Sequence, residues 1–469
     1  MILSRLVARH TLRSNSSLNL RRTITMATAQ KILISPQNTG LLGVKQTDEA
    51  ANKASQLLQK DLESFHVFFN QDGFHNHLVH HLLTLYGTGA DPAALQQGFD
   101  GNTGYQRPVQ PNHDRVIEDL QTWSHASKYV GKEQYYPDFL AFFQREIDSK
   151  GWEAVLAEYL FTGTEAADDL LVRLYAGVLH PLIQLMYGME WNQPAIVAEG
   201  LAQTCVHKDN FKDELLAAER NANDEYGKTG AKMPTIASLL REVRENQKLA
   251  TAARFEDGNK IRDGVFGRAR DEMVAIMSKV KVRPEEVEEK TAEMFNTAVF
   301  MAAGATFHPP KINKFDFFLM HHVNSCPIFL TFNAQPWISA ENKARLLEWK
   351  IRYDLFQYAA RGVPNLSLDE IKAYQPRAPT SASGAAEVAL KIHRMSDDGH
   401  AIKLARAASI CEQITKKYQD KDWVLIKGDD TWKRVHHLIL DSLQSPGEYW
   451  VRSAGMDEAW KNFPNVNKL

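Results

Sequence analysis

Four histidines crowd one short apolar helix near the N-terminal end of the chain. They occupy seven residues, His75, His77, His80 and His81, and the helix continues as LLTLYG. Residues three and four positions apart share a face of a helix, so His77 points the same way as His80 or His81. A single core histidine usually bonds to a backbone carbonyl, but that explanation weakens for four together. Two convergent imidazoles suggest a metal site.

Three further histidine positions lie in or beside apolar segments. His180 precedes Pro181 at a junction where a new helix is expected to begin, and His321 with His322 interrupts FFLMHHVN. For His180, and for one of His321 and His322, the sequence leaves two possibilities open: a metal ligand, or a buried histidine with a local partner. His207 is expected at a helix end, where a helix-dipole contact is the better explanation.

Lys350 lies at the edge of the apolar face of the helix ENKARLLEWKIRYDLFQYAARG. The simple interpretation is a lysine that pairs with Asp354 one turn later. The alternative is a buried lysine that carbon dioxide has carbamylated, which would supply an anionic oxygen ligand. A site dominated by imidazole suits zinc, copper, iron or nickel, so the residues do not fix the metal.

Helical periodicity runs through almost the whole chain, and period-2 alternation is hard to find. Asp91-Pro92 is typical of a helix start, and Ser339 begins a long helix that Gly362 closes. We therefore predict an all-α protein. We expect a large helical domain with the metal site over residues 31–363. A linker or loop rich in Pro, Ser and Ala should follow over residues 364–384. A smaller C-terminal helical part, residues 385–469, should pack on the main domain.

Composition and missing motifs exclude several classes of protein. A net charge of −2 gives no electrostatic case for nucleic acid. Cys205, Cys326 and Cys411 lie far apart, so no disulfide framework is expected. Apolar runs fall short of the roughly 20 residues that a membrane span needs, and we expect a soluble protein. The sequence contains no HExxH, GxGxxG, GxSxG or P-loop, and hence offers no place for a Rossmann-type flavin or nicotinamide.

The first thirty residues differ from the rest in composition. They carry five arginines and several serines, and no acidic residue precedes Asp48. This composition is typical of a mitochondrial presequence. The alternative is a disordered upstream extension of a cytoplasmic protein that starts at Met26. The sequence therefore predicts a mitochondrial location if residues 1–25 are a presequence and a cytoplasmic one otherwise.

Four long segments resemble the fungal questin oxidase-like family. They are FHNHLVHHLLTLYGTGADPAALQQGFDGNTGYQRP, HPLIQLMYGMEWNQPAIVAEGLAQ, KFDFFLMHHVNSCPIFLTFNAQPWISAENKARLLEWKIRYDLFQYAARGVP and YWVRSAGMDEAW. The similarity runs from about Lys31 to about Trp460. The family begins close to Met26, which favours an added segment at residues 1–25.

The resemblance implies an oxidoreductase that uses dioxygen on a small aromatic polyketide. Its reaction would be Baeyer–Villiger-type insertion of oxygen beside a ring ketone, or the opening of an anthraquinone-type ring, with NADPH as a possible reductant. The resemblance also implies non-haem iron. The implied iron ligands are His77, one of His80 and His81, His180, His321 and, through a carbamate, Lys350.

For the substrate, we expect contacts from a glycine-containing loop and from an aromatic pocket. Tyr105 and Arg107 end the loop, and Trp191 is a candidate for the pocket. Two other functions remain as alternatives, a non-catalytic helical scaffold and a zinc-dependent hydrolase.

Overall fold

Helices make up nearly all of the regular structure, which confirms the predicted all-α class. The computed structural model describes residues 26–377 and 384–466. Within these ranges the chain forms twenty-one α-helices and one pair of two-residue strands. Most of the predicted N-terminal targeting segment lies outside the described residues.

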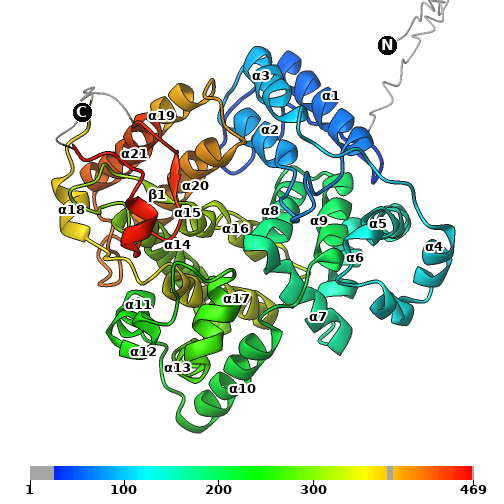
Figure 1. Cartoon of the computed structure of the whole chain (residues 1–469). Coiled ribbons are helices and arrows are strands. Elements are labelled where there is room, and N and C mark those ends of the chain that lie inside the picture. The colour runs from blue at the N-terminus through cyan, green and yellow to red at the C-terminus, as the bar shows by residue number, and fades with distance from the viewer. Residues whose placement is uncertain (1–25, 378–383, 467–469) are drawn as a thin grey trace, which may run out of the picture.

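The first three helices form one layer at the top of the molecule in Figure 1. They pack against one another and are α1 (Asp48–Ser64), α2 (Leu78–Gly87) and α3 (Pro92–Thr103). The predicted start of α3 is confirmed, because the Asp91 side chain accepts a hydrogen bond from the Ala94 amide and Pro92 follows the cap. Every residue of α2 is buried.

The next group of helices packs around the pair formed by α8 and α9, which belong to the same group. Its members are α4 (Asp114–Leu120), α5 (Tyr136–Lys150), α6 (Trp152–Leu160), α7 (Glu165–Leu174), α8 (Ala176–Glu190) and α9 (Pro194–Val206), with short 3-10 turns at Trp123–Lys128 and Glu133–Tyr135. Among the described residues no single helix is long and apolar enough to cross a membrane. Helices α7 and α8 meet both criteria only when they are taken together, and they are bent by 94° at their junction.

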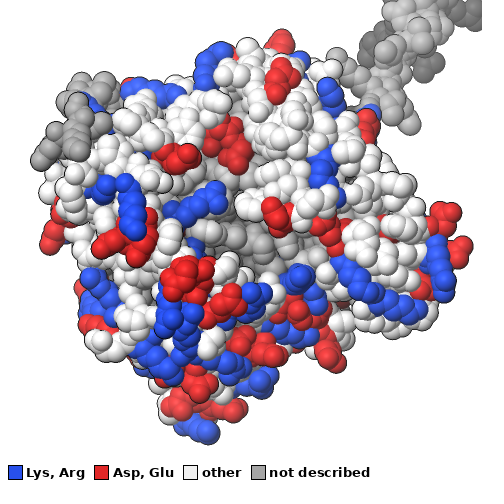
Figure 2. Space-filling view, viewed as in Figure 1, with Lys and Arg blue, Asp and Glu red and all other residues white. Residues whose placement is uncertain are grey.

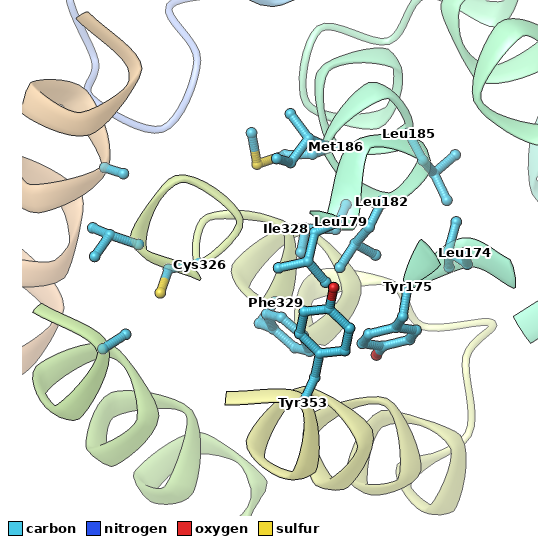
Figure 3. Packing of buried hydrophobic residues seen from close by; sticks show 14 of the residues in the cluster. Leu174, Tyr175, Leu179, Leu182, Leu185, Met186, Cys326, Ile328, Phe329 and Tyr353 are labelled. Atoms are coloured by element: carbon cyan, nitrogen blue, oxygen red, sulfur yellow. The ribbon is translucent and has the colours of Figure 1, made fainter. Parts of the chain in front are cut away.

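The third group supplies the centre of the core. It contains α10 (Lys212–Thr229), α11 (Ile236–Glu245), α12 (Gln247–Ala250), a π-helical segment (Lys260–Phe266), α13 (Gly267–Met277), a 3-10 turn (Pro284–Glu286), α14 (Val287–Gly304), α15 (Phe317–Asn324), α16 (Ile328–Ala334) and α17 (Ala340–Ala360). Ser339 caps α17 by accepting a hydrogen bond from the Asn342 amide, as predicted. Figure 3 shows Leu179 and Leu182 of α8 facing Tyr353 of α17, so apolar packing fixes these two helices relative to each other.

The last group contributes to the same core. It contains α18 (Leu368–Ala373), α19 (Ala385–Ile392), α20 (His400–Thr415), α21 (Asp429–Gln444) and 3-10 turns at Lys416–Tyr418 and Asp457–Trp460. The strands β1 (Phe315–Asp316) and β2 (Trp450–Val451) pair in parallel. Since α20 packs against α2, α14 and α15, the C-terminal part is built into the main helical body. Helix α18 lies inside the predicted linker, of which residues 378–383 fall outside the description.

Candidate metal centre

Four histidines from four distant parts of the chain converge in the core. They are His77 at the start of α2, His180 in α8, His321 in α15 and His400 at the start of α20, and all are buried. The Nε2 atoms of His77 and His180 are 2.8 Å apart, and those of His321 and His400 are 3.1 Å apart. The ring centroids of His77 and His400 lie 4.6 Å apart, so the two pairs are adjacent. We call these four residues the histidine quartet.

The other ring nitrogen of each quartet member is held by an oxygen atom. Asp398 binds two of them, with Oδ2 3.1 Å from Nδ1 of His77 and Oδ1 2.5 Å from Nδ1 of His400. Nδ1 of His180 lies 2.6 Å from the Gly177 carbonyl oxygen, and Nδ1 of His321 lies 2.6 Å from that of Phe317. Each ring is therefore fixed from behind with its Nε2 atom directed inward.

These contacts determine which nitrogen carries the hydrogen. Carboxylate and carbonyl oxygens only accept hydrogen bonds, so each Nδ1 is the donor and each neutral ring keeps a lone pair on Nε2. Burial is the main cause that lowers the pKa of all four imidazoles, and it takes the pKa of His77 to about 3. The Nε2 lone pairs of His77 and His180 thus face each other without a hydrogen between them, as do those of His321 and His400. Ligand atoms of His77, His180 and His400 all lie within 4.8 Å of one another.

A metal ion satisfies this arrangement. Two imidazole nitrogens about 2.1 Å from one ion, at an angle between about 90° and 110°, lie about 3.0 to 3.4 Å apart. The Nε2 separations of 2.8 and 3.1 Å are close to that range. The donor set of four imidazoles with carboxylate and carbonyl partners fits a transition metal, whereas a hard cation such as Mg²⁺ prefers oxygen.

The backbone before His180 is strained in a way that serves the quartet. Gly177, Val178 and Leu179 have φ values of 54°, 55° and 66°, a left-handed conformation that side chains with a branched Cβ such as Val178 rarely adopt. This bend places the Gly177 carbonyl against Nδ1 of His180. A Cβ atom at Gly177 would lie 2.5 Å from Cε1 of His207, so only glycine fits there. Strain of this kind tends to be kept at functional sites.

Lys403 is the buried cation beside the quartet. It lies on α20 three residues after His400, it is 2% exposed, and its Nζ has no hydrogen-bond partner among the described residues. Burial lowers the pKa of Lys403 to about 8, against the opposing effect of Asp398. The Lys403 charge also helps to lower the pKa of every quartet histidine.

The structure brings His77, His180 and His321 together and places the other predicted α2 ligands beside them. Nε2 of His80 donates to Oε1 of Gln184 at 2.7 Å, and its Nδ1 has no partner in the described part of the chain. The Gln184 amide nitrogen donates to Glu199 at 3.0 Å, which fixes this orientation. His81 instead packs against Gly399, so neither residue directs Nε2 into the quartet.

Lys350 is engaged elsewhere. Its Nζ lies 2.5 and 2.8 Å from the two carboxylate oxygens of Asp354, which is the simple interpretation made from the sequence. Asp354 also binds Nδ1 of His322. All three side chains are buried and form a charged cluster of their own. The structure thus separates His322 and Lys350 from His321, whose Nε2 atom faces the quartet.

The three predicted substrate contacts lie in different surroundings. Tyr105 is 43% exposed and lines a cleft of about 1000 Å³ whose wall includes Asp397 and Asp398. Arg107 forms an ion pair with Glu133 at 2.6 Å. Trp191 is buried in the core, with its ring 5.3 Å from that of Tyr86. Of the three, only Tyr105 shares a cleft with a residue that contacts the quartet.

Sequence reasoning missed His400, Asp398 and Lys403. They occur together as DDGHAIK, in which the histidine has polar neighbours and the lysine opens an ordinary amphipathic helix. The available signal in the sequence was Gly399. In the structure its φ is 97°, and a Cβ atom there would lie 2.8 Å from Cβ of His81, so α20 can begin this close to α2 only with glycine at this position. His207 was expected at a helix end, and it caps α9, but its ring lies 2.8 Å from Nε2 of His75.

Comparison with known proteins reveals similarity over nearly the whole chain. Residues 74–408 match the family model described as questin oxidase-like. The Baeyer–Villiger oxidase ptaJ of Pestalotiopsis fici is 35% identical over 448 residues, covering 94% of this chain and 99% of that protein. The questin oxidase of Aspergillus fumigatus is 35% identical over 457 residues, covering 94% and 100%. The Baeyer–Villiger monooxygenase dmxR6 of a Cryptosporiopsis species is 37% identical over 443 residues, covering 92% and 98%.

Proposed function

Because this chain belongs to the questin oxidase-like family, we propose that it is an oxygenase that acts on an aromatic polyketide. Its reaction is insertion of oxygen beside a ring ketone, or opening of an anthraquinone-type ring. The names of its relatives, Baeyer–Villiger oxidase and questin oxidase, support this reaction class. The single observation that supports a metal-dependent route is the set of four inward-facing Nε2 lone pairs.

In this proposal His77, His180, His321 and His400 hold non-haem iron, which supplies the redox chemistry that dioxygen needs. Asp398 keeps two of the imidazoles in the Nδ1–H form, and the carbonyls of Gly177 and Phe317 keep the other two. Oxygen atoms that accept a hydrogen bond from the far nitrogen of a ligating imidazole fix the ring and raise its basicity. Phe317 packs against His321 and His400 with ring centroids 4.8 and 5.0 Å away and covers that side of the two imidazoles.

The electron balance defines the co-reactant. Insertion of one atom of dioxygen into a carbon–carbon bond leaves the second atom to be reduced to water, which takes two electrons and two protons. Either NADPH or the hydroquinone form of the substrate supplies these electrons. NADPH therefore belongs to the proposal as a reductant. When the substrate arrives as a hydroquinone, it supplies the electrons itself and the enzyme needs no nucleotide-binding site.

We further propose that a carbamate, where one forms, is carried by Lys403 and not by Lys350. The Nζ atom of Lys403 is buried beside the quartet without a hydrogen-bond acceptor among the described residues, which is a costly arrangement for an ammonium group. Addition of carbon dioxide would turn this amine into an anionic oxygen donor. Lys350 already has both oxygens of Asp354 as partners.

The direct test is metal analysis of protein purified without chelators. The proposal predicts near-stoichiometric iron in the native chain, loss of that iron in His321→Gln, and retention in His81→Gln as the matched buried control. Iron-dependent oxygen uptake with an anthraquinol completes the test. Zinc without oxygen uptake would favour the hydrolase, and absence of metal with unchanged melting after EDTA treatment would favour the scaffold.

A further inference from the structure

A second, smaller cavity is linked to the quartet through Phe317, because its wall includes Arg452, whose guanidinium carbon stands 4.3 Å over the Phe317 ring. Its volume is about 400 Å³, within the roughly 300–1,000 Å³ of small-molecule sites, and its wall contains Lys260, Phe318, Gln357, Arg361 and Arg452. Figure 2 shows the molecule hollowed at the centre of this face, with both basic and acidic side chains around the hollow. The cavity combines an aromatic wall with three cations.

Arg361 is the most informative of these cations because it is buried and forms no ion pair with any described residue. It is 4% exposed, and its Nε has no hydrogen-bond partner in the described part of the chain. Its guanidinium carbon lies 4.0 Å from the ring centroid of Phe318. A buried charge without an acceptor is costly, so a ligand that supplies an acceptor is stabilised there.

The neighbouring carboxylate, Asp316, is fully used by the backbone. Its Oδ1 accepts hydrogen bonds from the amides of Phe318 and Leu319, and its Oδ2 accepts from those of Ser453 and Ala454. Four amide donors occupy this carboxylate, and none of its hydrogen bonds goes to Arg361. Asp316 therefore shapes the loop that carries the cavity and leaves the guanidinium available.

The other charges in the wall leave the cavity positive. Nζ of Lys260 donates only to the carbonyls of Phe255 and Asp257, at 2.7 and 3.2 Å. The acid in the wall, Asp257, is bound by both guanidinium nitrogens of Arg268 at 2.8 and 2.7 Å, and this pairing lowers its pKa to about 2. Arg452 stands 4.3 Å over the ring of Phe317 with no carboxylate partner among the described residues.

The cavity and the quartet share structural elements. Phe317, which lies under Arg452, also contacts His321 and His400. Val178 lines the cavity and follows Gly177, whose carbonyl holds His180. A flat molecule bound against Phe318 therefore contacts the ring that packs on Phe317, since the centroids of Phe317 and Phe318 are 5.4 Å apart.

We propose that this cavity binds the ionised oxygen of a planar aromatic substrate, a carboxylate or phenolate, with Arg361 as its main partner. Guanidinium groups suit this role because they both bind planar anions and stack on aromatic faces. The bound anion fixes which edge of the ring system turns toward the quartet. This inference rests on the proposed function and names the charge that its substrate carries.

The test is direct binding to metal-free protein, measured by calorimetry at low ionic strength. The probes are anthraquinone-2-carboxylate and its neutral amide, anthraquinone-2-carboxamide. We expect Arg361→Gln to weaken carboxylate binding about tenfold or more, Arg361→Lys to restore part of it, and the amide to bind weakly to every form. Arg262→Gln is the control, since this exposed arginine of the π-helical segment that carries Lys260 pairs with Asp263, and the variant should bind the carboxylate as the native chain does.

Further arms keep the test decisive. Arg452→Gln, at an exposed position, should also weaken carboxylate binding and covers the case in which Arg361→Gln does not fold. Equal binding of carboxylate and amide, or no effect of either substitution, would overturn the proposal. If inorganic phosphate or NADP⁺ competes with the carboxylate probe and binds more tightly than it does, the cavity would be assigned to a nucleotide phosphate instead. Because the protein is metal-free here, the result does not depend on whether the quartet holds iron.

Discussion

Nε2 of His77 and Nε2 of His180 lie 2.8 Å apart although each ring already donates its hydrogen from Nδ1. In water, such a contact would be repulsive because two lone pairs face each other. Here a carboxylate and a backbone carbonyl hold the rings in place, and His321 and His400 repeat the arrangement beside them. The fold therefore holds two close contacts between lone pairs, which a bound cation would relieve.

Asp398 should control metal affinity through the two imidazoles that it orients. We expect Asp398→Asn to weaken metal binding about 10- to 100-fold, because an amide supplies one acceptor where the carboxylate supplies two. Asp441→Asn is the control, since that buried carboxylate accepts hydrogen bonds from the Tyr374 hydroxyl and the Arg377 amide and from no quartet histidine. Competition with a chelator of known affinity measures the difference. Equal affinities for the two variants would contradict this role of Asp398.

Gly177 should be essential for the bend that carries His180. We expect Gly177→Ala to lower the free energy of unfolding by about 2–4 kcal/mol, because the new Cβ collides with the His207 ring and the left-handed backbone disfavours alanine. Gly227→Ala in α10 should be neutral or stabilise by up to about 1 kcal/mol, since nothing lies within 4 Å of its Cβ position. Urea denaturation compares the two, and similar losses would be the contrary result.

Of the buried lysines, Lys350 should have a structural role and Lys403 a role in the site. We expect Lys350→Met to destabilise the fold by about 3–5 kcal/mol, because it leaves the Asp354 carboxylate buried without its cation. Lys391→Met breaks an ion pair of the same spacing at the surface and should cost less than about 0.5 kcal/mol. Denaturant midpoints measure this contrast.

Lys403→Met should act on the site. We expect it to lower metal content and to abolish a carbamate signal in ¹³C spectra of protein equilibrated with labelled bicarbonate. Under conditions in which the Lys350→Met variant is folded, it should keep the carbamate signal. A carbamate that disappears with Lys350 and persists without Lys403 would return the assignment to the position suggested by the sequence.

Glu199 should make stability fall as the pH rises. Burial, reinforced by Asp61, raises the pKa of Glu199 from 4.5 to about 8, so the folded state holds a proton that the unfolded state releases. The sign follows: this contribution is intact below about pH 4.5 and is lost progressively toward pH 8. We expect Glu199→Gln, which keeps an acceptor for Gln184, to be more stable than the native chain by about 1 kcal/mol or more at pH 8 and to match it near pH 5. Exposed Glu118→Gln is the control, and a difference that does not change with pH would refute this origin.

The local part of the architecture, the helices and their ends, could be predicted from the sequence. Caps such as Asp91 and Ser339, with helical periodicity between them, gave the helices, and three of the four quartet members stood out as histidines in apolar surroundings. His400 did not, because its burial arises from the packing of α20 against α2 and α15, more than 300 and 70 residues away along the chain. Lys403 looked like any helix lysine for the same reason. His80 does not direct Nε2 into the quartet because Gln184 on α8 binds it, and no spacing rule in the sequence contains that partner.

The most direct measurement is anomalous scattering at the iron edge from crystals of the chelator-free protein. The account predicts one strong peak within about 2.3 Å of the Nε2 atoms of His77, His180, His321 and His400. A peak bound by other residues would contradict it. So would an iron-free quartet in which ordered waters separate the four rings.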